Sequence, residues 1–284
     1  NGNAHCHGDW HGNAHTCARD AEGAITCWGS AVDARAQVPP DAGPFAQVVA
    51  GAEFTCALGV TGTVVCTGQA DQGQTMVPEG LGAVVAIAAG AFHACALDAA
   101  GAVTCWGNDR WGQCAVPAGL GAVVAIAAGE RHTCALDAAG VVTCWGNDDW
   151  GQASVPDALG PAAGLSAWGY HTCALDAAGA TSCWGDWIAG RPAARPDLAR
   201  IVDLVPGNDH ACALDAAGAV DCWGLGMSGQ TAVPEGLGDV VELDAGGDTT
   251  CARRADGTVT CWGDPDDDAQ DVPEDLRAAD QIAV

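Results

Sequence analysis

The segment Cys95-Ala-Leu-Asp-Ala-Ala-Gly-Ala-Val-Thr-Cys105 decides the fold, because close copies of it return at a fixed interval along the chain. Its first cysteine recurs every 39 residues, at positions 17, 56, 95, 134, 173, 212 and 251. Its second cysteine keeps the same step, at positions 27, 66, 105, 144, 183, 222 and 261. A strict period of this length is typical of repeat architectures, in which each repeat forms one supersecondary unit. The whole fold can therefore be predicted from a single unit.

One unit contains four short segments with the features of β-strands. In the third unit these segments are 84–90, 93–97, 103–107 and 113–117. Each is β-branched or alternates apolar and polar residues, each is bounded by Gly, Pro, Asn or Asp, and none has a sustained helical period. Seven units of four antiparallel strands bury both faces of every sheet when they close radially. The sequence therefore predicts an all-β, seven-bladed β-propeller with four antiparallel strands per blade.

The chain ends favour a closed ring over a linear β-solenoid. Seven periods of 39 fill 273 of the 284 residues, so both ends cover the same phase of the repeat. Residues 274–284 follow the repeat pattern, whereas residues 1–11 do not. We therefore expect a propeller over 12–284. In one blade, 276–284 supplies the first strand and 12–39 supplies the other three. Residues 1–11 are then a surplus N-terminal leader.

The two cysteines of each unit are predicted to face each other across a hairpin. The Asp-Ala-Ala-Gly turn fits a three-residue loop with Gly101 in the left-handed region, and counting back from it places Cys95 opposite Cys105. At such a non-hydrogen-bonded pair the Cα atoms approach to about 4.5 Å, within the window for a disulfide. A zinc site is the weaker alternative, because one hairpin offers two ligands only. The expected disulfides are Cys17–Cys27, Cys56–Cys66, Cys95–Cys105, Cys134–Cys144, Cys173–Cys183, Cys212–Cys222 and Cys251–Cys261.

Composition excludes several classes of protein. The chain has 36 acidic residues, 10 Arg and no Lys, for a formal charge of −26, which excludes binding to nucleic acid through a basic surface. The longest apolar runs, such as 84–89, are far shorter than the roughly 20 residues of a membrane-spanning helix, so we expect no membrane insertion. Sixteen cysteines favour an oxidising compartment, so we expect an extracellular or periplasmic protein.

The fullest unit, 127–152, reads Ala-Ala-Gly-Glu-Arg-His-Thr-Cys-Ala-Leu-Asp-Ala-Ala-Gly-Val-Val-Thr-Cys-Trp-Gly-Asn-Asp-Asp-Trp-Gly-Gln. This string resembles the regulator-of-chromosome-condensation repeat family. The short unit and the Gly-Gln-x-x-Val-Pro ending at 112–117 and 151–156 look most like the secreted propeller-type β-lactamase inhibitor proteins of that superfamily. The resemblance implies a seven-bladed propeller that binds proteins. It does not imply the nuclear exchange-factor role, which relies on basic contacts that this chain lacks.

The loops on one face of the ring differ most between units. Because neighbouring strands are antiparallel, the loops after the first and third strands of all units share this face. Exposed aromatic residues mixed with Arg and Asp are typical of protein-interface hot spots, although the rings have the alternative role of capping their own blades. The candidate binding residues are Phe92, Asp109, Arg110, Trp111, Arg131, Asp148, Asp149, Trp150, Trp168, Tyr170 and Trp187.

Recurring histidines and tryptophans are interpreted as structural. The histidines stand two residues before the first cysteine, which indicates hydrogen bonding rather than metal ligation: His15, His93, His132, His171 and His210. The tryptophans follow the second cysteine and indicate packing between blades: Trp28, Trp106, Trp145, Trp184, Trp223 and Trp262. Alternative metal sites are the leader histidines near Cys6 and the acidic loop 264–271, which lacks EF-hand spacing. We expect neither a metal nor a cofactor.

Cys6 and Cys114 fall outside the seven pairs. The leader reaches about 20 Å from residue 12 to Cys6, whereas the path around the ring to Cys114 is on the order of 30 Å, which disfavours an internal bridge. One hypothesis is that the leader adds as a strand to a second copy and that Cys6 bonds its Cys114, giving a head-to-tail homopolymer. The alternative is a flexible tail with two unpaired thiols.

No enzymatic motif emerges from the sequence. Only five Ser are present, none in a nucleophile elbow, and no carboxylate pair departs from the repeat. We therefore expect a secreted, non-catalytic module that binds another protein or copies of itself. The alternative is a secreted inhibitor of a hydrolase such as a β-lactamase, and the remote alternative is a propeller lyase.

Overall fold

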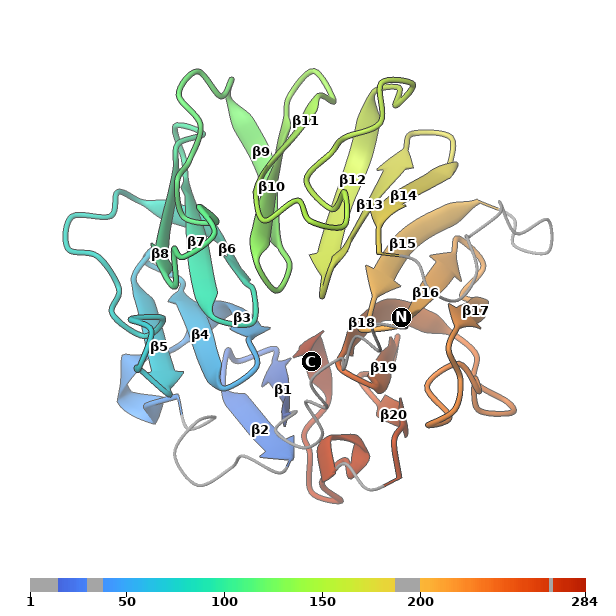
Figure 1. Ribbon diagram of the computed structural model, residues 1–284. Coiled ribbons are helices and arrows are strands. Elements are labelled where there is room, and N and C mark those ends of the chain that lie inside the picture. The colour runs from blue at the N-terminus through green and yellow to red at the C-terminus, as the bar shows by residue number, and fades with distance from the viewer. Residues whose placement is uncertain (1–14, 30–37, 187–199, 266–267) are drawn as a thin grey trace, which may run out of the picture.

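Seven three-stranded antiparallel sheets surround a central axis in the computed structural model, which describes residues 15–29, 38–186, 200–265 and 268–284 (Figure 1). Blade 1 is β21 (Ala279–Ala283), β1 (His15–Asp20) and β2 (Ile25–Gly29). Blade 2 is β3 (Phe45–Ala50), β4 (Phe54–Gly59) and β5 (Val64–Gly68). Blade 3 is β6 (Val84–Ala89), β7 (His93–Asp98) and β8 (Val103–Gly107). Blade 4 is β9 (Val123–Ala128), β10 (His132–Asp137) and β11 (Val142–Gly146).

The same order continues around the ring. Blade 5 is β12 (Ala162–Trp168), β13 (His171–Asp176) and β14 (Thr181–Gly185). Blade 6 is β15 (Ile201–Pro206), β16 (His210–Asp215) and β17 (Val220–Gly224). Blade 7 is β18 (Val240–Gly246), β19 (Thr249–Arg254) and β20 (Val259–Gly263). Two 3-10 helices, η1 (Pro40–Ala42) and η2 (Asp268–Gln270), complete the regular elements of the described residues.

The strand from the C-terminal end lies beside the first strand of the chain. β21 pairs antiparallel with β1, with Ala18 opposite Ile282, so blade 1 takes strands from both ends. The first strands of all seven blades line one central cavity of about 300 Å³. This arrangement is the ring that the repeat phase predicts. The leader 1–11 lies outside the described residues.

Each hairpin holds its two cysteines directly opposite each other. In blade 3, Cys95 pairs with Cys105 in the β7–β8 register, and Gly101 has φ +83° in the turn. The Asp98 carboxylate fixes this turn by accepting from the backbone N–H groups of Ala100 and Ala102. All seven expected disulfides are present, with Cα–Cα distances of 4.0 to 4.1 Å. The predicted pairing is confirmed.

The fourth segment of the unit is not a strand in the described residues, so the prediction of four strands per blade is wrong. Residues 113–117 instead follow a turn, and side chains of the next blade hold their backbone. The Gln113 carbonyl accepts from the Thr133 hydroxyl and the Trp145 indole N–H, both at 2.9 Å. These bonds take the place of a strand ladder, and Pro117 has no N–H to offer one.

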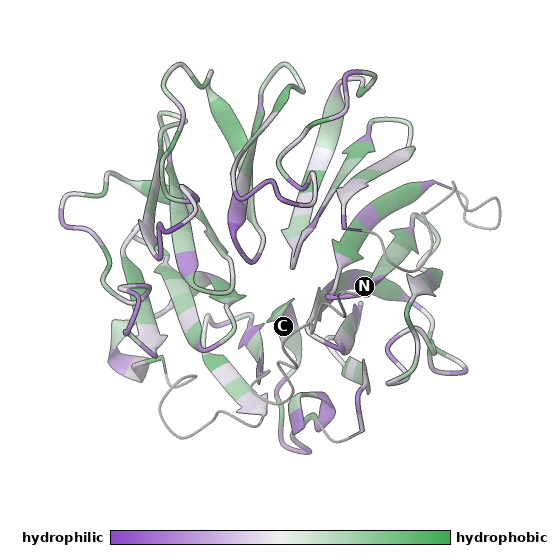
Figure 2. Ribbon diagram, viewed as in Figure 1, coloured by the Kyte–Doolittle hydropathy of each residue, from purple (hydrophilic) through white to green (hydrophobic). Residues whose placement is uncertain are grey.

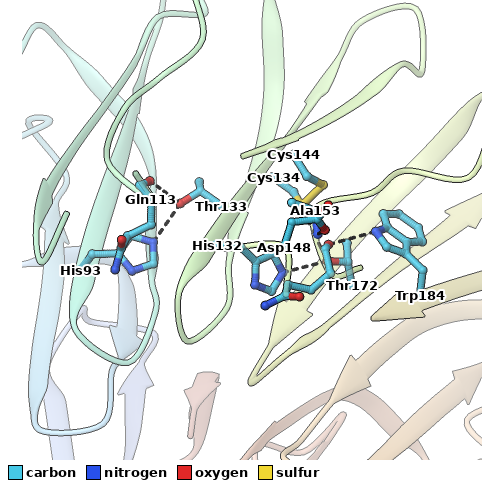
Figure 3. The surroundings of a disulfide bond; sticks show 11 residues. His93, Gln113, His132, Thr133, Cys134, Cys144, Asp148, Ala153, Thr172 and Trp184 are labelled. Carbon is cyan, nitrogen blue, oxygen red and sulfur yellow. Dashed lines mark hydrogen bonds between the residues drawn. A yellow bond between two sulfur atoms is a disulfide. The ribbon is translucent and has the colours of Figure 1, made fainter. Parts of the chain in front are cut away.

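Buried histidines join neighbouring blades by a repeated hydrogen bond. The Nε2 atom of His93 in blade 3 lies 2.8 Å from the Thr133 hydroxyl in blade 4, and His132 reaches Thr172 in blade 5 at the same distance (Figure 3). His15 and His210 make the same bond to Thr55 and Thr250 at 2.7 Å. The six recurring tryptophans are buried. The structural role predicted for both sets is confirmed.

The apolar core lies between blades rather than in one central mass. Leu97 of blade 3, for example, packs with Val123, Ala135 and Trp145 of blade 4. Figure 2 shows the strands mostly in the colours of hydrophobic residues and the hydrophilic residues gathered in the loops. The blades are therefore rigid supports for loops on the two faces of the ring.

Candidate functional site

The loops after the first and third strands of a blade lie together on one face. The N–H of Asn108, after β8, donates to the carbonyl of Phe92, which lies between β6 and β7, at 2.9 Å. In blade 4 the N–H of Asn147 donates to the carbonyl of Arg131 at 2.8 Å. In blade 5 Asp186 donates to Tyr170 at 3.1 Å. In each of blades 3 to 5 these two loops are therefore neighbours.

Arg131 lies between two aromatic rings from different blades. Its guanidinium carbon is 5.5 Å from the centroid of Trp111 in blade 3 and 5.6 Å from that of Tyr170 in blade 5. The guanidinium of Arg110 lies 5.8 Å from the Trp111 ring. Cation–π contacts at these distances hold Arg and aromatic side chains together at a surface. We call Phe92, Arg110, Trp111, Arg131, Trp150 and Tyr170 the arginine–aromatic face.

Glu130 orients two members of this face. Its Oε1 atom is 2.9 Å from an Arg131 guanidinium nitrogen and accepts a 2.9 Å hydrogen bond from the Tyr170 hydroxyl. Burial and the Glu130 carboxylate raise the pKa of the Tyr170 hydroxyl, so this group stays protonated and donates. The contacts join blades 4 and 5 and fix the orientation of both side chains.

Two indole rings remain exposed on this face. Trp111 is 40% exposed and Trp150 is 46% exposed. Trp111 borders a cavity of about 210 Å³, which is also lined by Phe92, Asn108, Arg110, Gln113 and Arg131. Large exposed tryptophans next to a cavity are typical of interface anchors.

The aspartates of the candidate set shape their own loops. The Asp109 carboxylate accepts from the Cys114 N–H at 2.8 Å. The Asp148 carboxylate accepts from the Ala153 N–H at 2.8 Å and from the Ser154 hydroxyl. Asp149 accepts from the Asn147 side chain at 2.8 Å. These contacts shape the loops that carry Trp111 and Trp150, and the carboxylates make the rim of the arginine–aromatic face acidic.

Trp168 lies apart from the Trp111 cavity. It ends β12, at the position where other blades have Gly90 or Gly129, and it lines the central cavity. The strand tolerates this side chain because the tight turn that follows is made by Gly169, with φ +47°. Trp187 lies outside the described residues.

The sequence did not single out a group of carboxylates in the central cavity. Asp203, Glu242 and Asp244 line it from β15 and β18. Burial raises the pKa of all three, that of Asp244 to about 7. Arg253 pairs with Glu242, and the Asp244 carboxylate accepts from the Val284 N–H at 2.9 Å. Their signal in the sequence is an acidic residue within an otherwise apolar first strand, at Asp203, Glu242 and Asp244.

Cys114 carries the free thiol of the described residues, and Cys6 lies outside them. The Cys114 thiol donates to the Asn108 carbonyl at 3.3 Å. Burial and the Asp109 carboxylate raise the pKa of this thiol to about 12, which disfavours the thiolate. No group of three metal-ligating side chains occurs among the described residues; the leader histidines and residues 266–267 of the acidic loop lie outside these residues. No described helix is long and apolar enough to cross a membrane.

The fold and the hairpin disulfides define a disulfide-stabilised repeat propeller. The model of the regulator of chromosome condensation (RCC1) repeat matches residues 45–74, 84–113, 123–152 and 240–268. These four segments are therefore RCC1-like repeats. No protein in the curated set matches the sequence.

Several solved structures share this fold. The ectodomain of the receptor kinase CR4 from Physcomitrella patens is 28% identical, with a TM-score of 0.75, over 89% of this chain and 71% of that chain. The CRINKLY WD40 ectodomain of ACR4 from Arabidopsis thaliana is 23% identical, with a TM-score of 0.73, over 88% and 93%. Prp20p from Saccharomyces cerevisiae is 18% identical, with a TM-score of 0.70, over 83% and 79%. The seven disulfides and the receptor ectodomains fit an extracellular propeller module.

Proposed function

We propose that this protein is a secreted, non-catalytic module that binds another protein through its arginine–aromatic face. The observation that carries the proposal is the exposure of Trp111 and Trp150, with Trp111 beside an ordered Arg and Tyr cluster that spans blades 3 to 5. Tryptophan, tyrosine and arginine are the residues most enriched among interface hot spots. Side chains already held by Glu130 lose little rotamer freedom on binding.

The neighbours support a binding role in general terms. Two of them are receptor ectodomains, and Prp20p is described together with its binding to Gsp1p and histones. Those partners belong to those proteins. A chain with a formal charge of −26 and an acidic rim around the face favours a partner whose surface is neutral or basic.

Binding to a purified partner tests the proposal. Extracellular proteins of the source organism are passed over the immobilised chain, and a retained protein is purified and titrated by interferometry. Trp111→Ala with Trp150→Ala is expected to weaken binding at least 100-fold, because each buried interface tryptophan contributes about 2 kcal/mol or more. The melting temperature should not change, since both rings are exposed.

Met227 provides a matched control. It is 89% exposed in the loop after β17, on the same face but in blade 6. Met227→Ala should bind as the unchanged chain does. If no protein is retained, or if the double tryptophan variant binds normally, the proposal is wrong. A large loss of melting temperature in that variant would instead support the capping role of the rings.

Two predictions from the sequence are tested by the same material. Incubation with secreted hydrolases, β-lactamases included, shows whether the face acts as an inhibitor. A non-reducing gel shows whether Cys6 and Cys114 link copies into multimers that collapse with reductant. The raised pKa of the Cys114 thiol does not favour such a link.

A further inference from the structure

Arg110 has no carboxylate partner among the described residues. Ion pairs in the described part of the chain engage Arg19 with Asp280, Arg131 with Glu130, Arg253 with Glu242 and Arg277 with Asp20. The Arg110 guanidinium instead borders the cavity beside Trp111. Arg200 and Arg254 also have no ion pair in the described part of the chain, but neither borders this cavity.

The side-chain oxygens of Asn108 and Gln113, which line this cavity, already accept hydrogen bonds. The Asn108 side chain is committed, since its amide donates to Gln72 and its oxygen accepts from the Arg110 backbone N–H, both at 2.9 Å. The Gln113 oxygen accepts from the Trp111 N–H at 2.9 Å. A guanidinium has five N–H donors, so Arg110 and Arg131 retain most of theirs. A ligand that satisfies them must bring acceptors and negative charge.

We propose that the cavity of about 210 Å³ between blades 3 and 4 binds the carboxylate of a glutamate or aspartate side chain of the partner protein. This inference rests on the proposed function and names the chemistry that the face recognises. The Arg110 guanidinium donates to the two carboxylate oxygens, the bidentate geometry in which Arg binds carboxylates most strongly, while Arg131 keeps its ion pair with Glu130 beside it. The Phe92 and Trp111 rings contact the methylene groups of the side chain.

The overall charge limits what else the partner presents. Long-range repulsion from a chain of charge −26 opposes an acidic partner, while the close contact with the Arg110 guanidinium is attractive. The recognised carboxylate therefore stands alone in a neutral or basic surface. A phosphate brings a second negative charge into the same field and is bound less well.

A small probe tests the cavity without the partner. The α-amides of N-acetyl-glutamate and N-acetyl-glutamine, which differ only in the side-chain carboxylate, are titrated into the ¹⁵N-labelled chain, and the indole N–H signal of Trp111 is followed by NMR. We expect saturation by the glutamate probe with a dissociation constant of about millimolar order, as for a few contacts. The glutamine probe should bind at least tenfold more weakly, and inorganic phosphate should bind more weakly than glutamate.

The matched variants are Arg110→Ala and Arg200→Ala. Both residues are exposed, but Arg200 precedes β15 in blade 6 and takes no part in the cavity. Arg110→Ala should lower the affinity for the glutamate probe at least tenfold, and Arg200→Ala should not change it. Equal binding of the two amino-acid probes, tighter binding of phosphate, no saturable binding, or no effect of Arg110→Ala would overturn the inference.

The test separates this inference from the proposed function. Trp150 lies outside the cavity, so Trp150→Ala should leave probe binding unchanged while it weakens binding of the purified partner. If the probe binds and the partner does not, the cavity is a carboxylate site and the proposed function is wrong. If the partner binds but Arg110→Ala changes neither assay, the face binds protein and the carboxylate inference is wrong.

Discussion

Replacing Thr133 with valine removes one hydroxyl that serves two blades. The Thr133 oxygen lies 2.8 Å from Nε2 of His93 in blade 3 and donates to the Gln113 carbonyl at 2.9 Å. Gln113 keeps its second bond, from the Trp145 indole. His93 keeps none in the described part of the chain, because its Nδ1 atom already has no partner there. The variant therefore leaves a fully buried imidazole without a hydrogen bond.

The expected loss of stability follows from that count. An unsatisfied buried polar group costs about 1–3 kcal/mol, and a lost neutral hydrogen bond adds about 1 kcal/mol. Thr133→Val should therefore lower the free energy of unfolding by about 2–4 kcal/mol. For a domain of this size that corresponds to a fall in melting temperature of about 3–7 °C in calorimetry, and urea titration measures the change in free energy directly.

One control variant and one double variant test this prediction further. Thr104 is exposed on β8, so Thr104→Val should change stability by no more than about 0.5 kcal/mol. Blade 2 carries buried Phe54 where five other blades carry His, and its partner position holds buried Ala94 instead of Thr. His93→Phe combined with Thr133→Ala copies that natural pair and should be more stable than either single change. A Thr133→Val variant as stable as Thr104→Val would refute the reasoning.

Three further predictions follow from the titratable groups. Burial lowers the pKa of His93 and His210 from 6.5 to about 4 and that of His132 to about 3. Below pH 6.5 the unfolded chain therefore binds more protons than the folded chain. The free energy of unfolding, measured by urea titration, should fall as the pH is lowered from about 6.5 to 4. Burial raises the pKa of Asp244 from 3.8 to about 7, so its contribution is present in acid and lost as the pH rises through about 7. Asp244→Asn should remove this loss, and a difference between variant and unchanged chain that is constant from pH 4 to 8 would contradict it. The Cys114 thiol, with a pKa of about 12, should react with iodoacetamide at pH 8 only after unfolding, whereas rapid labelling of the folded chain would show an accessible thiolate.

The period and the hairpin were predictable because both depend on residues close in sequence. The turn at 98–101 fixes the register of β7 and β8, and the register fixes the disulfide between Cys95 and Cys105. The fourth segment was not predictable in the same way. Its backbone bonds come from Thr133 and Trp145, which lie 20 and 32 residues away and reach Gln113 only when the blades are stacked.

The same distinction applies to the candidate site: its place on one face was predictable, whereas its contacts between blades were not. Antiparallel strands were enough to place the loops of Trp111, Arg131 and Tyr170 on one face. That Arg131 lies between the two rings depends on the distance between blades, which the sequence does not state. The carboxylates of Asp203 and Asp244 meet only when the first strands of blades 6 and 7 close around the central cavity.

Comparing the repeat units with each other predicts some of the contacts between blades. The histidine of one unit bonds the threonine 40 residues later, and the chain changes both members together at Phe54 and Ala94. His171 is the instructive exception. Its partner position holds Ala211, and its Nε2 atom bonds the Asn208 carbonyl instead.

Blade 5 therefore departs from the repeat at its interface with blade 6 and also in its first loop, where Trp168 replaces glycine and Tyr170 joins the arginine–aromatic face. Blade 7 has the same tight hairpin, at Gly247, without aromatic residues, so the hairpin alone does not demand them. The rings of blade 5 are an addition to a loop that is complete without them. Such an addition is expected where a surface contacts a partner, since the blade itself gains no core from it.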